Sequence, residues 1–251
     1  MEVFNYKKIN QSKYSNKDPF PHIELDNLWN ESLLDQCRKD MINFSNWEGE
    51  KNFFAAKSKK YTRKYNDFPN SVKKIIDEMN SQKFIKWLES FTNEKELKID
   101  PTFSKGIFTG GGIQSIEKGG FLKIHADFNW HEKIQLYRKL NILIYLNENW
   151  KETWGGFLEL WSKDVKKCEK KISPTFNKTV IFSTDDFSYH GHPEPLNCPS
   201  NVWRNSLVFY YYSPIKSKRV YFKRDNTKYK ERDIDNFHKG NILKRIYRKI
   251  M

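Results

Sequence analysis

Three residues of the chain could together bind a metal ion. His125 and Asp127 are separated by one residue, so on a β-strand both side chains would point to the same face. His190, much further along the chain, could bring a second imidazole from a distant strand. Two histidines and one carboxylate make up the facial triad that leaves positions open on non-haem Fe(II). A lone His-x-Asp is common by chance, so the prediction depends on its context.

The stretch from Arg204 to Tyr212 predicts an anion-binding strand. Period-two alternation places two sets of side chains on opposite faces: Arg204, Ser206, Val208 and Tyr210 on one, and Leu207, Phe209 and Tyr211 on the other. Burying an unpaired guanidinium costs several kcal/mol, so Arg204 on this face calls for an anion. A dicarboxylic cosubstrate would supply one through a bidentate pair.

The remaining elements are expected to form a β-fold behind a helical layer. We predict a strand over 19–25, a helix from the N-cap Asn30 to about Phe44, and further helices from Asn70 and around Phe84. Residues 45–66 are interpreted as a loop over the site. Beyond Pro101, short apolar stretches alternate with Gly, Asn and Pro turns, which is typical of a β-sandwich or barrel. Strands are expected over 140–147, 157–161, 179–183 and 204–212, with a solvated connection over 163–171.

Length and charge divide the chain into three parts of one structural domain. A strand and helices over 1–100 are expected to pack on a catalytic β-core over 101–214, followed by a basic extension over 215–251. This extension holds thirteen Lys or Arg and four Asp or Glu, so it carries +9 of the net charge of +14. It could dock phosphates or acidic glycans, or be a solvated, partly helical tail. We favour the tail because no nucleic-acid motif accompanies the charge, although nucleic-acid binding stays open.

The cysteines and the N-terminus predict a cytoplasmic protein. The three cysteines are widely spaced and form no CxxC pair. The first residues lack the apolar core of a signal peptide, and no run approaches the roughly 18 apolar residues that a membrane span needs. The sequence does not indicate an oligomeric state.

Five motifs in order resemble the Fe(II)/2-oxoglutarate-dependent dioxygenases, most closely the prolyl-4-hydroxylase-like branch. They are His125-Ala-Asp127, the segment 144–150, the segment 155–160, His190, and Arg204-Asn-Ser206. The resemblance covers about 101–213, and the Pro-Phe-Pro-His-Ile stretch at 19–23 also resembles that branch. It implies a mainly β fold with supporting N-terminal helices (α+β), namely a double-stranded β-helix of the jelly-roll, cupin-like kind.

The resemblance also implies roles for individual residues. His125, Asp127 and His190 match the iron ligands. Arg204 matches the residue that pairs with the distal carboxylate of 2-oxoglutarate, with Ser206 beside it and the Tyr145 hydroxyl on the same carboxylate. His192 has the same strand parity as His190 and stays an alternative ligand.

The residues expected around the substrate are less specific. Tyr210 could wall the pocket, and Gln114 or Ser115 occupies the position where relatives place a tyrosine near the other carboxylate. Trp130, Trp154 and Trp203 are expected to be exposed and are candidate substrate contacts. His131 is a further histidine, expected at the surface.

The activity implied by the resemblance is hydroxylation of an unactivated C–H bond. Fe(II), 2-oxoglutarate and O₂ would be needed, with ascorbate as a possible further requirement, and succinate and CO₂ would be released. The presence of Asp127 favours hydroxylation over halogenation. A prolyl residue of a peptide or protein is the expected substrate. A sugar, glycan or small metabolite is the alternative, as is a non-enzymatic jelly-roll binding module.

Overall fold

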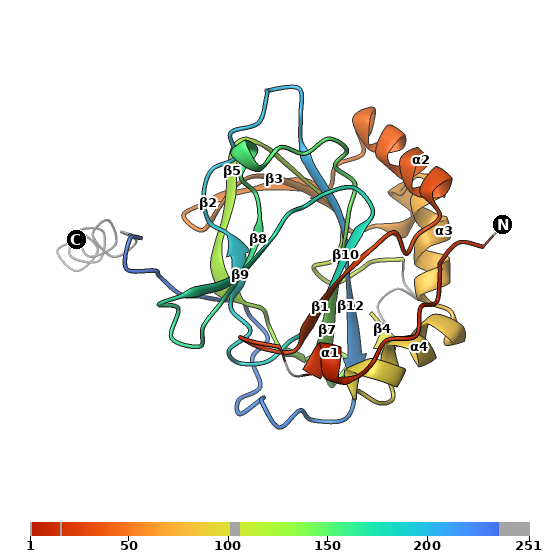
Figure 1. The fold of residues 1–251 in the computed structure, drawn as a ribbon, viewed down its shortest axis with the longest axis vertical. Helices are drawn as coiled ribbons and strands as arrows, with labels where there is room; N and C mark the ends of the chain where they lie inside the picture. Colours follow the sequence, from red (N-terminus) through yellow and green to blue (C-terminus); the bar gives the residue numbers. More distant parts are fainter. Residues whose placement is uncertain (1, 16, 101–105, 236–251) are drawn as a thin grey trace.

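A curved antiparallel sheet backed by helices forms the fold in the computed structural model, which describes residues 2–15, 17–100 and 106–235 (Figure 1). The helices are α1 (Ser12–Ser15), α2 (Glu31–Ile42), η1 (Tyr65–Asp67), α3 (Asn70–Met79), α4 (Gln82–Thr92) and η3 (Glu152–Trp154). The strands are β1 (His22–Asp26), β2 (Gly49–Phe53), β3 (Ala56–Thr62), β4 (Lys98–Ile99), β5 (Gly112–Ala126), β6 (Trp130–His131), β7 (Leu136–Tyr145), β8 (Leu158–Trp161), β9 (Cys168–Ile172), β10 (Lys178–Ser183), β11 (His190–His192), β12 (Arg204–Ser213) and β13 (Lys228–Tyr229).

The described strands pair in the order β1-β10-β7-β12-β5-β11-β8-β9, with β3 and β13 also pairing with β5. Strands far apart in the sequence are therefore neighbours: β12 lies between β7 and β5, and β11 lies between β5 and β8. The sheet curls so that β5 and β8 face β7 and β10 across the barrel (Figure 1). This is the double-stranded β-helix with supporting helices that the sequence predicts, and the predicted fold class is confirmed.

The helices cover the outer face of the sheet. Asn30 caps α2 as predicted, because its side chain accepts a hydrogen bond from the Leu33 backbone N–H at 3.0 Å. Apolar side chains of α2, α3 and α4 pack on strand residues Ile142, Leu207 and Phe209 in one buried cluster. The outward residues of β7 and β12 are thus buried by helices, so their inward residues are free to line a pocket.

Residues 45–66 contain a β-hairpin formed by β2 and β3. The interpretation of this segment as a loop is therefore wrong. β2 and β3 pair with each other, and β3 pairs along β5 from Ala56 to Thr62. The hairpin is rich in charge and has no clear periodicity, but β5 supplies its backbone partners and Ala55 and Ala56 are buried. The predicted connection over 163–171 is likewise partly wrong, because β9 begins at Cys168 and pairs with β8.

The C-terminal segment returns to the barrel after β12. β13 pairs with β5, placing Tyr229 opposite His125, and Arg232 forms an ion pair with Glu194 at 2.6 Å. Residues 215–235 contain β13 and turns but no helix, and 236–251, where the predicted helical part of the tail could fall, lie outside the described residues. Among the described helices, none has the length and apolarity needed to cross a bilayer.

Candidate metal and cosubstrate site

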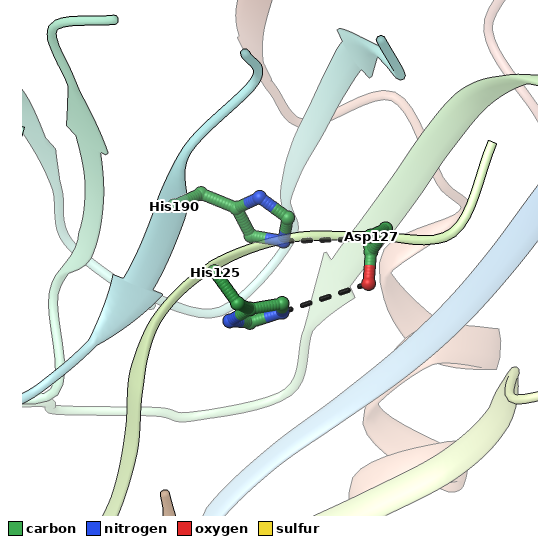
Figure 2. A group of neighbouring side chains, drawn as sticks. All are labelled: His125, Asp127 and His190. Atoms are coloured by element: carbon green, nitrogen blue, oxygen red, sulfur yellow. Dashed lines mark ion pairs between the residues drawn. The ribbon is translucent and has the colours of Figure 1, made fainter. Parts of the chain in front are cut away.

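His125, Asp127 and His190 converge at one end of the barrel (Figure 2). The register of β5 and β11 pairs His125 directly with His190, and Asp127 follows β5 immediately. The Nε2 atoms of His125 and His190 lie 3.6 and 3.4 Å from the two oxygens of Asp127. Two ligand atoms bound to one ion at about 2.1 Å, roughly at right angles or slightly wider, lie about 3.0–3.4 Å apart. The observed distances are close to this range and the ligand atoms lie within 4.8 Å of one another, so the three side chains could hold one ion.

Both histidines are held in the tautomer that a metal requires. Nδ1 of His125 lies 2.8 Å from the Lys123 carbonyl oxygen, and Nδ1 of His190 lies 2.9 Å from that of Ser188. A carbonyl oxygen only accepts, so each Nδ1 carries the proton and each Nε2 keeps its lone pair. Burial, reinforced by the neighbouring His125, lowers the pKa of His190 to about 3. The His190 ring is therefore neutral and available as a ligand.

The Asp127 carboxylate is fixed by two donors from β7. Its Oδ2 accepts hydrogen bonds from Arg138 Nη2 at 2.8 Å and from Asn141 Nδ2 at 2.7 Å. Burial alone would raise the pKa of Asp127, but the charge of Arg138 and the contacts with both histidines hold it well below its ordinary value. Since Oδ2 is engaged twice, Oδ1 is the oxygen left to face the ion. Asp127 is thus ionised and oriented before any metal arrives.

Arg138 and Asn141 were not found by sequence reasoning. Arg138 is fully buried, donates to Asn141 Oδ1 at 2.6 Å, and lies 3.3 Å from the centre of the Tyr210 ring. Asn141 shares its strand parity with Tyr145, one of the predicted pocket residues. The sequence signal that could have identified Asn141 is a polar residue at an inward position of an otherwise apolar strand.

Replacing Arg138 with methionine is expected to weaken metal binding about 10- to 100-fold, the usual effect of losing a residue that orients a metal ligand. Competition with a chromophoric chelator would measure the affinity. Arg38→Met removes the same kind of side chain from the surface of α2 and should leave the affinity unchanged. Equal metal affinities for the two variants would mean that Arg138 does not support the metal site.

Arg204 is buried, lines the same pocket and has no carboxylate partner among the described residues. Its Nε donates to the Gly156 carbonyl oxygen at 2.7 Å and its Nη2 to the Tyr145 hydroxyl at 3.2 Å. Burial lowers the pKa of Arg204, and Tyr145 opposes that shift. Burial raises the pKa of Tyr145, so its hydroxyl keeps a proton to donate. Together these groups can receive a carboxylate.

Most of the other predicted residues line the pocket. The lining includes the metal-site residues and, in addition, Lys59, Gln114, Ile116, Leu122, Asn141, Leu143, Leu158, His192, Arg204, Ser206, Val208 and Tyr210. The inward parity predicted for Arg204, Ser206, Val208 and Tyr210 is confirmed. Tyr145 contacts this pocket through Arg204, and Tyr210 donates its hydroxyl to the Gly110 carbonyl oxygen at 3.0 Å.

Three aromatic or imidazole side chains, Trp154, Trp130 and His131, do not line the pocket. Trp154 packs edge-on against Trp150, and its role as a substrate contact stays a prediction. Trp130 is buried, and His131 is buried with its Nε2 3.1 Å from the Thr109 hydroxyl, so their predicted exposure is wrong. His192 lines the pocket but is not part of the ligand cluster, which contains His190.

Comparisons with known proteins agree with this fold. Residues 111–212 match the sequence model of the 2OG-Fe(II) oxygenase superfamily. A Trichoplax adhaerens prolyl hydroxylase in complex with a hypoxia inducible factor peptide fragment is 17% identical, with a TM-score of 0.57 over 80% of this chain and 88% of its own. A Pseudomonas putida prolyl-4-hydroxylase is 14% identical, with a TM-score of 0.53 over 76% and 91%. HygX from Streptomyces hygroscopicus, with nickel and 2-oxoglutarate bound, is 7% identical, with a TM-score of 0.51 over 86% and 94%.

The fold and the side chains at its mouth define a jelly-roll protein with a His-Asp-His cluster that could hold a metal ion. Residues 111–212 therefore carry the signature of the 2OG-Fe(II) oxygenase superfamily, and the chain has the fold of the prolyl hydroxylases. The matched segment indicates a 2-oxoglutarate- and Fe(II)-dependent oxygenase, with Fe(II), 2-oxoglutarate and O₂ as its cofactors.

Proposed function

We propose that His125, Asp127 and His190 hold Fe(II), and that Arg204, Tyr145 and Ser206 bind the distal carboxylate of 2-oxoglutarate. One observation carries this proposal: two Nε2 lone pairs and an ionised carboxylate converge in a pocket that also contains the buried guanidinium of Arg204, which has no carboxylate partner among the described residues. Ser206 lies opposite both Tyr145 and Gln114 in the sheet, so these residues form one row across β7, β12 and β5.

The chain's own residues prepare the site for oxidation. Bound Fe(II) supplies O₂ activation coupled to decarboxylation of 2-oxoglutarate into succinate and CO₂. The protein keeps His190 neutral and Asp127 ionised, so the ligands need no proton loss when the metal binds. Arg204 orients the cosubstrate, and the apolar side chains of Leu143, Leu158 and Val208 exclude water around it.

Anaerobic titration with Fe(II) and then 2-oxoglutarate tests the assignment. A 2-oxo acid chelating Fe(II) should produce a metal-to-ligand charge-transfer band in the visible. Absence of the band in folded, metal-loaded protein would contradict the proposal.

We further propose a prolyl residue of a peptide or protein as the substrate. Phe53 and Phe54, at the tip of the β2–β3 hairpin, and Tyr229 of β13 form an aromatic cluster with ring centres 5.5–5.8 Å apart. Phe53 and Phe54 are 41% and 57% exposed, and the Tyr229 ring lies 5.5 Å from that of His125. Proline-rich peptides dock on aromatic faces, so this cluster suits a prolyl substrate beside the metal. The similar Trichoplax structure contains a peptide, which also favours this class.

Proline-containing peptides should stimulate succinate release, whereas sugars should not. Phe54→Ala should raise the KM for the peptide several-fold, since stacking on one aromatic ring contributes about 0.5–1.5 kcal/mol. Ile42→Ala, at an exposed apolar position of α2, is the matched control and should leave KM unchanged. Stimulation by sugars alone would replace the prolyl proposal with the glycan alternative.

A further inference from the structure

Lys59 is a buried cation that the proposed roles do not use. It lies on β3, is 9% exposed, and lines the pocket that contains His125 and Arg204. Among the described residues it has no hydrogen bond or ion pair with a carboxylate. Burial and the charge of Lys51 lower its pKa to about 7. A buried ammonium without a partner is costly, so its position indicates an anionic guest.

The sheet register sets Lys59 and Arg204 on either side of one residue. Ile116 of β5 is opposite Lys59 of β3 on one edge and opposite Arg204 of β12 on the other. Directly opposed residues point to the same face, so both cations enter the barrel from one row. Neighbouring strands are about 4.8 Å apart, which separates the two Cα atoms by roughly 10 Å. The two long side chains can therefore contact different ends of one small dianion.

Two further features indicate that the guest spans this pocket. His192 is buried at its wall, and neither ring nitrogen has a hydrogen-bond partner among the described residues. Arg138 is already paired with Asp127, so Lys59 and Arg204 are the two pocket cations left for a dianion.

We propose that Lys59 binds the carboxylate next to the keto group of 2-oxoglutarate, while Arg204 binds the distal one. This inference rests on the proposed function. Each carboxylate of the cosubstrate then has its own buried cation, and the keto acid head is oriented by the protein as well as by the metal. Lys59 would thereby make the contact with the keto-acid carboxylate for which relatives use a tyrosine at the position of Gln114. Gln114 lies two residues from Ile116 on the same face of β5.

Binding of two 2-oxo acids tests the contact without turnover. The charge-transfer band is titrated anaerobically with 2-oxoglutarate and with 2-oxobutanoate, which has the same keto acid head but no distal carboxylate. Lys59→Met should raise the Kd of both ligands by the same factor, roughly ten-fold, as for loss of a hydrogen bond to a charged group. Arg204→Met should raise the Kd of 2-oxoglutarate only.

The controls separate a local contact from general effects. Lys60→Met removes the next positive charge, which pairs with Glu117, and should leave both affinities unchanged. Lys59→Met should unfold at or above the wild-type temperature, because methionine replaces a buried charge. Lys59→Arg keeps the cation, should retain binding within a few-fold, and serves if the methionine variant does not fold.

Two results would overturn the inference while leaving the oxygenase intact. Unchanged affinity of Lys59→Met for both ligands would show that Lys59 does not touch the cosubstrate. Weakened binding of 2-oxoglutarate alone would place Lys59 at the distal carboxylate. If the wild-type protein itself gave no band with either ligand, the proposed function would fail, and the inference with it.

Discussion

Asp127→Ala is expected to abolish Fe(II) binding at micromolar metal and to abolish substrate-stimulated succinate release. The substitution removes the one carboxylate of the cluster and leaves Arg138 as a buried cation without its partner. The loss of metal affinity should exceed the 10- to 100-fold that follows loss of a residue that merely supports a ligand. His125→Ala and His190→Ala should behave alike, because each removes one converging Nε2. Isothermal titration with a divalent metal would measure the affinities.

His131→Ala provides the matched control for the metal ligands. His131 is also a buried histidine, but it contacts Thr109 and Tyr212 outside the ligand cluster. Its variant should bind metal as the wild type does. Should Asp127→Ala keep wild-type metal affinity while folded, the metal centre must lie elsewhere.

Arg204→Met is expected to separate cosubstrate binding from metal binding. Truncating one partner of a buried charge pair costs about 2–5 kcal/mol, which corresponds to a Kd for 2-oxoglutarate raised at least about 30-fold. Metal affinity should not change, since Arg204 donates to Gly156 and Tyr145 rather than to a metal ligand. Titration of metal-loaded protein with 2-oxoglutarate measures the first quantity and titration of metal-free protein with metal the second.

Tyr145→Phe is the graded companion of this variant. It removes a single hydroxyl and leaves the guanidinium, so the Kd should rise roughly ten-fold or less. A Tyr145→Phe effect larger than that of Arg204→Met would reverse the proposed roles, with the tyrosine as the main contact.

The sequence predicted those parts of the site that show a periodic pattern. Arg204, Ser206, Val208 and Tyr210 alternate on a strand, and alternation alone fixes which face they share. The fold class followed from the order of apolar stretches and turns, and the family resemblance narrowed it to a double-stranded β-helix. The choice of His190 over His192 came from the family resemblance, because a parity argument does not distinguish them, and the structure places His190 in the cluster.

The rest depended on pairing between distant strands. Lys59 lies in a charged segment without periodicity, and its inward orientation is set by pairing with β5, about 60 residues away. Arg138 and Asn141 reach Asp127 because the chain after β5 continues into β6, which pairs with β7. The basic composition beyond Ile215 likewise predicts solvent exposure, whereas Tyr229 is drawn to the sheet by backbone pairing with His125.

The return of the chain to β5 extends the catalytic unit beyond the matched family segment, which ends at residue 212. Arg224 donates to the backbone carbonyl oxygen of Asp127 at 2.6 Å, and β13 occupies the edge of β5 next to His125. A protein shortened after Ser213 would lose both supports and open the rim of the metal centre to solvent. Replacement of this segment would therefore change both the entrance to the pocket and the hydrogen bond that holds the Asp127 backbone.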